Sequence, residues 1–63
     1  MIRDKKQVLT DQLLALKAEL QQIRKLSLEA TRKGDFMRVA RLTATAAKLN
    51  RTIMDTESEL LVL

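Results

Sequence analysis

The chain has 63 residues, with 12 Lys and Arg against 8 Asp and Glu, no Cys, no His and a single aromatic residue. Without Cys and His, the chain cannot use disulfides, zinc-type ligand sets or the usual nucleophilic triads. Hydrophobic residues at 46% and charged residues at 32% argue against disorder, yet one domain of this size rarely builds a sufficient core alone. The composition therefore predicts one small domain, residues 1–63, that is stabilised by association.

The first half of the chain predicts one helix over about residues 5–32. Apolar residues recur there at spacings of three and four, which is typical of a helix that packs along one seam. Asp4, followed by Gln7, resembles a capping box at the start of this helix. The seam positions are Ile2, Lys6, Leu9, Leu13, Leu16, Leu20, Ile23, Ser27 and Ala30.

The only glycine, Gly34, lies in a predicted turn over residues 33–35. Glycine adopts the left-handed conformation that ends many helices, and Arg32 and Lys33 suit the electronegative end of the first helix. Asp35 has a side chain that can cap the next helix. We therefore expect the chain to reverse at Gly34, with Phe36 packed beneath the turn. The alternative for Phe36 is an exposed ring that stacks on a base.

The second half predicts a helix over about residues 36–61. Its seam positions are Val39, Leu42, Ala46, Leu49, Ile53, Thr56, Leu60 and Leu63. We expect the last leucines to be buried, the alternative being a docking peptide or degradation tag. A chain folded back at the turn pairs the two seams in one antiparallel register, with Leu9 beside Leu60, Leu20 beside Leu49 and Ala30 beside Val39. The predicted fold class is therefore all-α, an antiparallel two-helix hairpin.

A second apolar stripe suggests that the hairpin has a partner. The predicted self-association residues are Ala40, Ala47, Met54 and Leu61, and the first helix adds Leu14, Leu26 and Leu28. This is more apolar surface than one hairpin can bury. The simplest solution is a homodimer in which two hairpins form a four-helix bundle. The main alternative is another protein's helix, and the sequence leaves open whether two hairpins would lie parallel or antiparallel.

The net charge of +4 gathers near the turn. Residues 24–41 hold six basic residues against Glu29 and Asp35, and the rest of the chain is balanced. This predicts a tip that binds anions, on RNA, DNA or an acidic protein surface. The alternative is a solvated helix end, because no aromatic residues interleave to form a stacking platform. The six are Arg24, Lys25, Arg32, Lys33, Arg38 and Arg41.

No pattern of residues predicts catalysis, a cofactor or a metal. Asp55, Glu57 and Glu59 are interpreted as the solvated complement of the basic N-terminal segment, and a single glycine does not make a phosphate-binding loop. The first residues lack the apolar run of a secretory signal, and the longest apolar run, LLVL, is far too short to span a membrane. We therefore expect a cytoplasmic protein that is not an enzyme and has no membrane partner.

In length, heptads and hairpin plan the chain resembles the Rop-type plasmid copy-number proteins, dimeric four-helix bundles that bind paired RNA loops. None of that family's RNA-contacting residues can be placed on this sequence. The stretch GDFMRVARL is similar in plan to the hairpins of Gre-type transcription factors, where acidic residues follow the glycine, and here only Asp35 matches. The two-helix protein of the large ribosomal subunit and the hairpin chaperones of secretion systems share the layout. These resemblances imply a hairpin architecture and assign no function.

Three functions follow as expectations. The first is a non-enzymatic interaction module that self-associates and acts as an adaptor or regulator. The second is a small RNA-binding or DNA-binding protein that uses the basic tip. The third is a small chaperone or subunit that binds another protein's helix.

Overall fold

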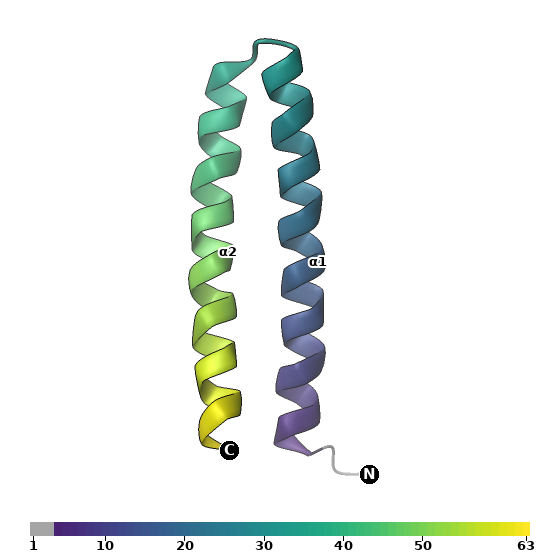
Figure 1. The fold of residues 1–63 in the computed structure, drawn as a ribbon, viewed down its shortest axis with the longest axis vertical. Coiled ribbons are helices and arrows are strands. Elements are labelled where there is room, and N and C mark those ends of the chain that lie inside the picture. The colour runs from purple at the N-terminus through teal and green to yellow at the C-terminus, as the bar shows by residue number, and fades with distance from the viewer. Residues whose placement is uncertain (1–3) are drawn as a thin grey trace.

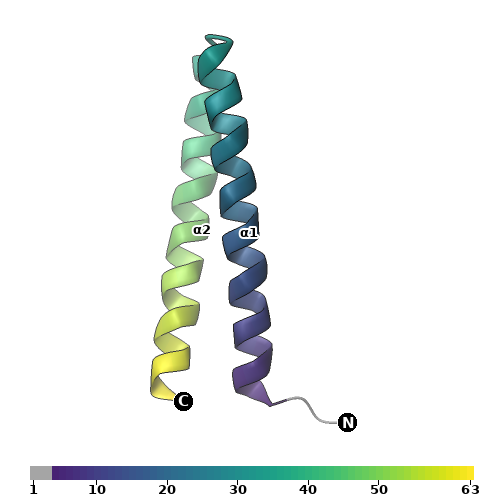
Figure 2. The ribbon, with the colours of Figure 1, turned by 45° about the vertical axis from the view of Figure 1, so that its right-hand side comes forward.

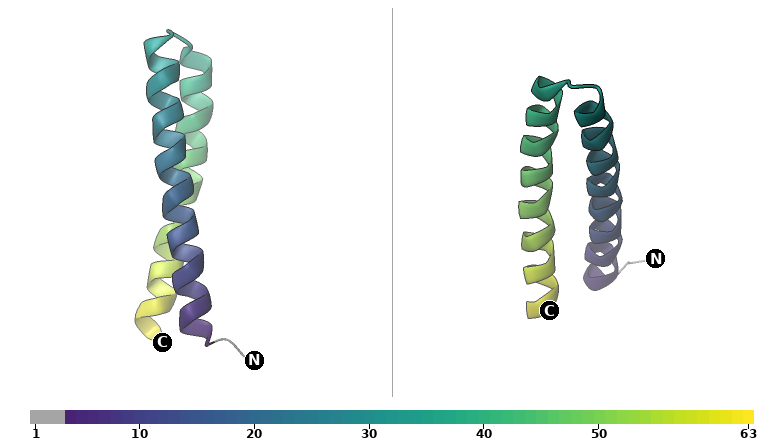
Figure 3. Two further views of the ribbon diagram at one scale, coloured as in Figure 1. Left: turned by 90° about the vertical axis from the view of Figure 1, so that its right-hand side faces the viewer. Right: turned by 45° about the horizontal axis from the view of Figure 1, so that its top comes forward.

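The computed structural model describes residues 4–63, which form two helices joined by a tight turn. Helix α1 spans Lys5–Arg32 and helix α2 spans Phe36–Val62. The helices lie side by side and antiparallel, crossing at a shallow angle, and the C-terminus lies near the start of α1 (Figures 1, 2 and 3). The predicted all-helical hairpin is confirmed, with α1 over the expected range and α2 one residue longer. The seam position expected at Ile2 lies outside the described residues.

Half of the capping box predicted at the start of α1 is wrong. The Asp4 carboxylate accepts a hydrogen bond from the backbone N–H of Lys6 at 3.3 Å, so it caps the helix. The Gln7 amide does not reach back to Asp4 and instead donates to the Asp11 carboxylate at 3.0 Å. Gln7 and Asp11 are one helical turn apart, where side chains are neighbours, and an ionised acceptor makes the stronger hydrogen bond.

The turn is closed by backbone hydrogen bonds centred on Gly34. Gly34 has a φ of 75°, in the left-handed region. Its N–H donates to the Thr31 carbonyl at 3.1 Å, and the Asp35 N–H donates to the Ala30 carbonyl at 2.9 Å. This pair of bonds is a Schellman motif, which satisfies carbonyls at the end of α1. The Asp35 carboxylate then accepts from the Arg38 N–H at 3.2 Å and caps α2, so three residues reverse the chain.

The core is the predicted seam. Leu9, Leu20, Ala30 and Ile53 are buried, together with Thr56, whose hydroxyl donates to the Thr52 carbonyl at 2.9 Å. The remaining seam positions between Leu13 and Leu60 are half-buried. Within residues 4–63 no side chain is less than 2% exposed, because a two-helix layer covers each seam residue from one side only. The burial pattern agrees with the expected antiparallel register.

Two residues expected in the packed interior are exposed. Phe36 is 70% exposed, so its predicted packing beneath the turn is wrong. The Schellman bonds already close this end of the hairpin by backbone contacts, and only small Ala30 lies buried below them. Leu63 is 60% exposed, so its predicted burial is also wrong: it follows the last residue of α2, and the seam position Lys6 near the start of α1 is exposed as well.

The hairpin is elongated, with extents of 48 × 21 × 12 Å, and it exposes more surface than a compact chain of its mass. Its accessible surface is 5297 Å². A compact folded monomer of 7.2 kDa exposes about 4,100 Å² by the usual scaling with mass. The excess is about 1,200 Å², because two helices form a single layer with two open faces.

Candidate interaction surfaces

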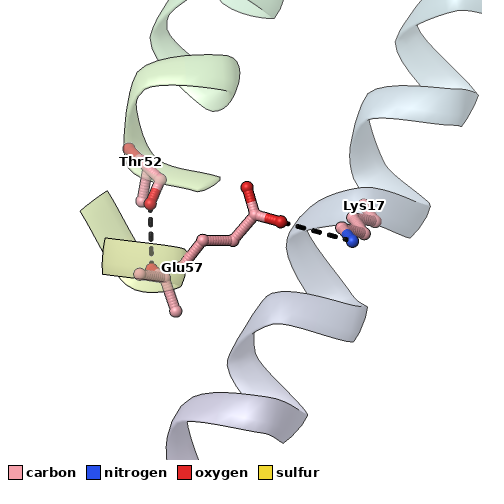
Figure 4. A network of polar contacts seen from close by, with 4 residues as sticks. Lys17, Thr52 and Glu57 are labelled. Carbon is pink, nitrogen blue, oxygen red and sulfur yellow. Dashed lines mark hydrogen bonds and ion pairs between the residues drawn. The ribbon is translucent and has the colours of Figure 1, made fainter. Parts of the chain in front are cut away.

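An ion pair marks one of the two open faces of the hairpin. The Glu57 carboxylate reaches from α2 to the Lys17 ammonium on α1, with a nitrogen–oxygen distance of 3.8 Å (Figure 4). The two side chains are 48% and 53% exposed, so solvent screens this pair and it contributes at most about 1 kcal/mol. The ion pair identifies which sides of α1 and α2 lie on the same face of the hairpin.

An open groove runs along the same face. It is lined by Lys17, Leu20, Gln21, Arg24, Asn50 and Ile53. Leu20 and Ile53 form its buried floor, and the polar side chains of both helices form its rims.

Apolar side chains flank these rims at spacings of three and four, which makes them neighbours on the helix surfaces. Leu14 and Leu28 lie beside Lys17 and Arg24 on α1, and both are at least 60% exposed. On α2, Met54 lies between Asn50 and Glu57 and is 66% exposed. We call this surface the Leu14/Met54 face, and its apolar members are Leu14, Leu28, Phe36, Ala40, Ala47, Met54 and Leu61.

All four predicted self-association residues are thus exposed on one face, together with two of the three apolar residues noted on α1. Leu26, the third, belongs to the opposite face and is half-buried. The sequence grouped it with Leu14 and Leu28. The structure separates them because Leu26 lines a small cleft on the other side of the seam.

The opposite face is charged, and near the turn it has a small cleft. Leu26 and Ala30 are the apolar residues of this cleft, and charged side chains complete it. The charged members are Glu29, Lys33, Asp35 and Arg38. Two cations and two carboxylates therefore lie together there. The two faces of the hairpin differ in kind: the Leu14/Met54 face holds most of the exposed large apolar side chains of residues 4–63, and the opposite face is mostly charged.

The six basic residues predicted as an anion-binding tip are all exposed, and among residues 4–63 none of them is in an ion pair. The structure does not gather them on one surface. Lys33 and Arg38 share the cleft of the charged face, while Arg24 lines the groove of the Leu14/Met54 face. The positive charge therefore surrounds the tip of the hairpin.

Within the described part of the chain, no group of three or more acidic side chains lies close enough to hold a metal ion. Neither helix, over the residues described, has an apolar stretch long enough to cross a membrane. No protein-family model matches the chain, and no match was found among curated proteins or solved structures.

Proposed function

We propose that the chain is a non-enzymatic interaction module that self-associates through its Leu14/Met54 face into a four-helix bundle. The observation that carries the proposal is the apolar content of this face. Of the eight large apolar side chains that are exposed among residues 4–63, five belong to it: Leu14, Leu28, Phe36, Met54 and Leu61. Exposed apolar patches of this kind mark interaction surfaces in small proteins.

The amount of exposed surface supports a partner of the same size. The excess of about 1,200 Å² over a compact chain is comparable with the roughly 800 Å² that each partner buries in a standard interface. A second hairpin laid over the Leu14/Met54 face would convert the single layer into two layers around a shared core. The alanines at 40 and 47 leave room for a close approach of helices at that interface.

The test is the concentration dependence of mass and melting. Because folding and association would be coupled, Tm should rise with protein concentration, and sedimentation at micromolar concentration should give twice the chain mass. A folded monomer with a concentration-independent Tm would refute the proposal. Tight co-purification with a different protein at equal stoichiometry would favour the alternative of a subunit or helix-binding chaperone.

Matched variants place the interface. Leu14→Gln with Met54→Gln removes two exposed apolar groups from the proposed interface without adding charge. Met37→Gln with Val62→Gln removes two comparably exposed groups, 73% and 85% exposed, that lie off this face. We expect the first pair of substitutions to raise the dimer dissociation constant tenfold or more, because each substitution loses about 1 kcal/mol or more of apolar burial. The second pair should leave the dissociation constant nearly unchanged. Equal effects of both pairs would contradict the assignment of the face.

A second candidate function is binding of a polyanion by the tip. It is favoured by the six cations around the turn, which are exposed and in no ion pair within the described part of the chain. Structured RNA, duplex DNA and heparin are titrated across a salt series, because phosphate contacts weaken steeply as salt rises. A variant with four tip cations changed to Gln should lose binding, while one with four cations elsewhere changed to Gln should retain it. Binding no tighter than about 10⁻⁴ M to any of the three would refute this candidate. The tip set is Arg32, Lys33, Arg38 and Arg41, and the control set is Lys5, Lys6, Lys48 and Arg51.

A further inference from the structure

We propose that two copies of the chain pair head to tail across their Leu14/Met54 faces, so that the tip of each hairpin lies beside the open end of the other. The open end consists of residues 4–12 and 55–63, where the chain begins and ends (Figure 1). This inference rests on the proposed self-association and adds the identity and orientation of the partner. Charge, shape and apolar exposure each bear on it.

The two ends of the hairpin carry opposite charge. The tip, residues 24–41, has six basic and two acidic residues, a net charge of +4. The described residues of the open end include two basic residues, Lys5 and Lys6, and five acidic residues, so their net charge is −3. Adding Arg3, which precedes them in the sequence, gives a net charge of −2. The five are Asp4, Asp11, Asp55, Glu57 and Glu59. A head-to-tail pair places each positive tip next to a negative end.

A head-to-head pair would place two tips of charge +4 against each other. Packed helices lie about 8–10 Å apart, close to the Debye length of about 8 Å at physiological salt, so screening weakens this repulsion without removing it. The apolar contacts of the face do not depend on the sign of the charges. Electrostatics therefore selects the orientation, and the head-to-tail arrangement is the favourable one.

One ion pair across the interface follows from the helix geometry. Arg24 lies about six residues from the midpoint of α1, on the side of the tip. In the antiparallel register, Glu57 of α2 lies at about the same distance from that midpoint, on the side of the open end. Inverting one copy brings Arg24 level with Glu57 of the partner subunit. Among residues 4–63 Arg24 is in no ion pair, and the Glu57 side chain remains 48% exposed beside Lys17. Two such pairs form, because the arrangement is symmetric.

When one copy is inverted, the apolar residues of α2 also fit against the same residues of the partner subunit. Their spacing of seven brings Met54 opposite Ala47 of the partner subunit, and Leu61 opposite Ala40 of the partner subunit. Each layer then joins a large side chain to a small one, as close packing requires. Phe36, 70% exposed at the tip, comes within about one helical turn of the partner's Leu61, which is 87% exposed at the open end.

A distance between two spin labels tests the orientation. The chain contains no Cys, so Met37→Cys introduces a single label at the tip, on a side chain that is 73% exposed and off the face. In a head-to-tail dimer the two labels are separated by about 40 Å along the bundle axis, from the helical rise. In a head-to-head dimer they lie side by side, within about 25 Å, which is roughly two helix diameters.

A label at Gln22→Cys, near the middle of α1, is the control. It gives an intermolecular distance in either arrangement and so reports dimerisation itself. A long distance at Met37 with a shorter one at Gln22 is the expected result. A short distance at Met37 would overturn the orientation and leave self-association standing. Failure of both labels to give any intermolecular distance, with a monomer mass in sedimentation, would overturn both proposals.

A charge variant provides an independent check. Arg24→Glu places a carboxylate opposite Glu57 of the partner subunit, whereas Lys25→Glu makes the same change of charge at the neighbouring position, outside the groove. We expect Arg24→Glu to weaken dimerisation about tenfold more than Lys25→Glu at low salt, with the difference shrinking as salt rises. Equal weakening by the two variants would refute the proposed ion pair.

Discussion

Replacing Gly34 by alanine isolates the energetic cost of the turn. At its φ of 75°, an added Cβ would meet no atom within 4 Å, so the substitution creates no clash. What remains is the local preference of the backbone. An L-residue in the left-handed conformation costs about 1–2 kcal/mol, and the reduced freedom of the unfolded chain offsets about 0.4–1 kcal/mol of that.

We therefore expect Gly34→Ala to lower the free energy of unfolding by about 1 kcal/mol per chain. Gly34→Asn should cost less, because asparagine visits this region more readily. Urea unfolding followed by circular dichroism at 222 nm measures both, at one protein concentration so that association does not confound the comparison.

Two results would refute this reasoning. An alanine variant as stable as the parent would mean that residue 34 is not held in the left-handed region. A loss well above about 3 kcal/mol would mean that the new methyl group meets atoms where the structure has open space. In the expected case the helical content of the folded state is unchanged, because the Schellman bonds use backbone atoms only.

Three further predictions concern the seam and the caps, each measured as the free energy of unfolding at fixed concentration. Leu20→Ala should lower the free energy of unfolding by about 2–5 kcal/mol, because it truncates a buried side chain. The control Leu63→Ala, at a 60% exposed position, should lower it by less than about 1 kcal/mol. Similar losses in the two variants would contradict the burial pattern. Asp35→Ala should cost about 1 kcal/mol, because it removes the 3.2 Å hydrogen bond that the Asp35 carboxylate accepts from the Arg38 N–H. Asp35→Asn should largely retain stability, since asparagine also caps helices. An equal loss in both variants would show that capping is not the cause. Thr56→Val should be neutral or stabilising by up to about 1 kcal/mol, because the Thr56 hydroxyl bonds only to a carbonyl of its own helix. A marked loss of stability would point to a further partner for that hydroxyl.

The sequence alone was sufficient for the hairpin because its determinants are local. Helix bounds depend on capping residues and on the position of the one glycine, and these act over four or five residues. The spacing of the seam likewise reports which side of each helix is apolar, so the buried positions Leu9, Leu20, Ala30 and Ile53 could be assigned without coordinates. Stripe residues at heptad spacing, such as Ala47 and Met54, were placed on one side for the same reason.

What only the tertiary structure decided is how residues outside the seam are divided between the two faces. Sequence spacing places Leu14, Leu26 and Leu28 on α1, but which of them adjoin the exposed stripe of α2 depends on how the second helix lies against the first. The cations of the tip were likewise one cluster in sequence and surround the tip in space. Phe36 was expected inside because aromatic burial is favourable on average, yet Phe36 is 70% exposed, and it does not line the small cleft near the turn, which lies on the charged face. Such outcomes follow from long-range geometry, which local sequence patterns do not encode.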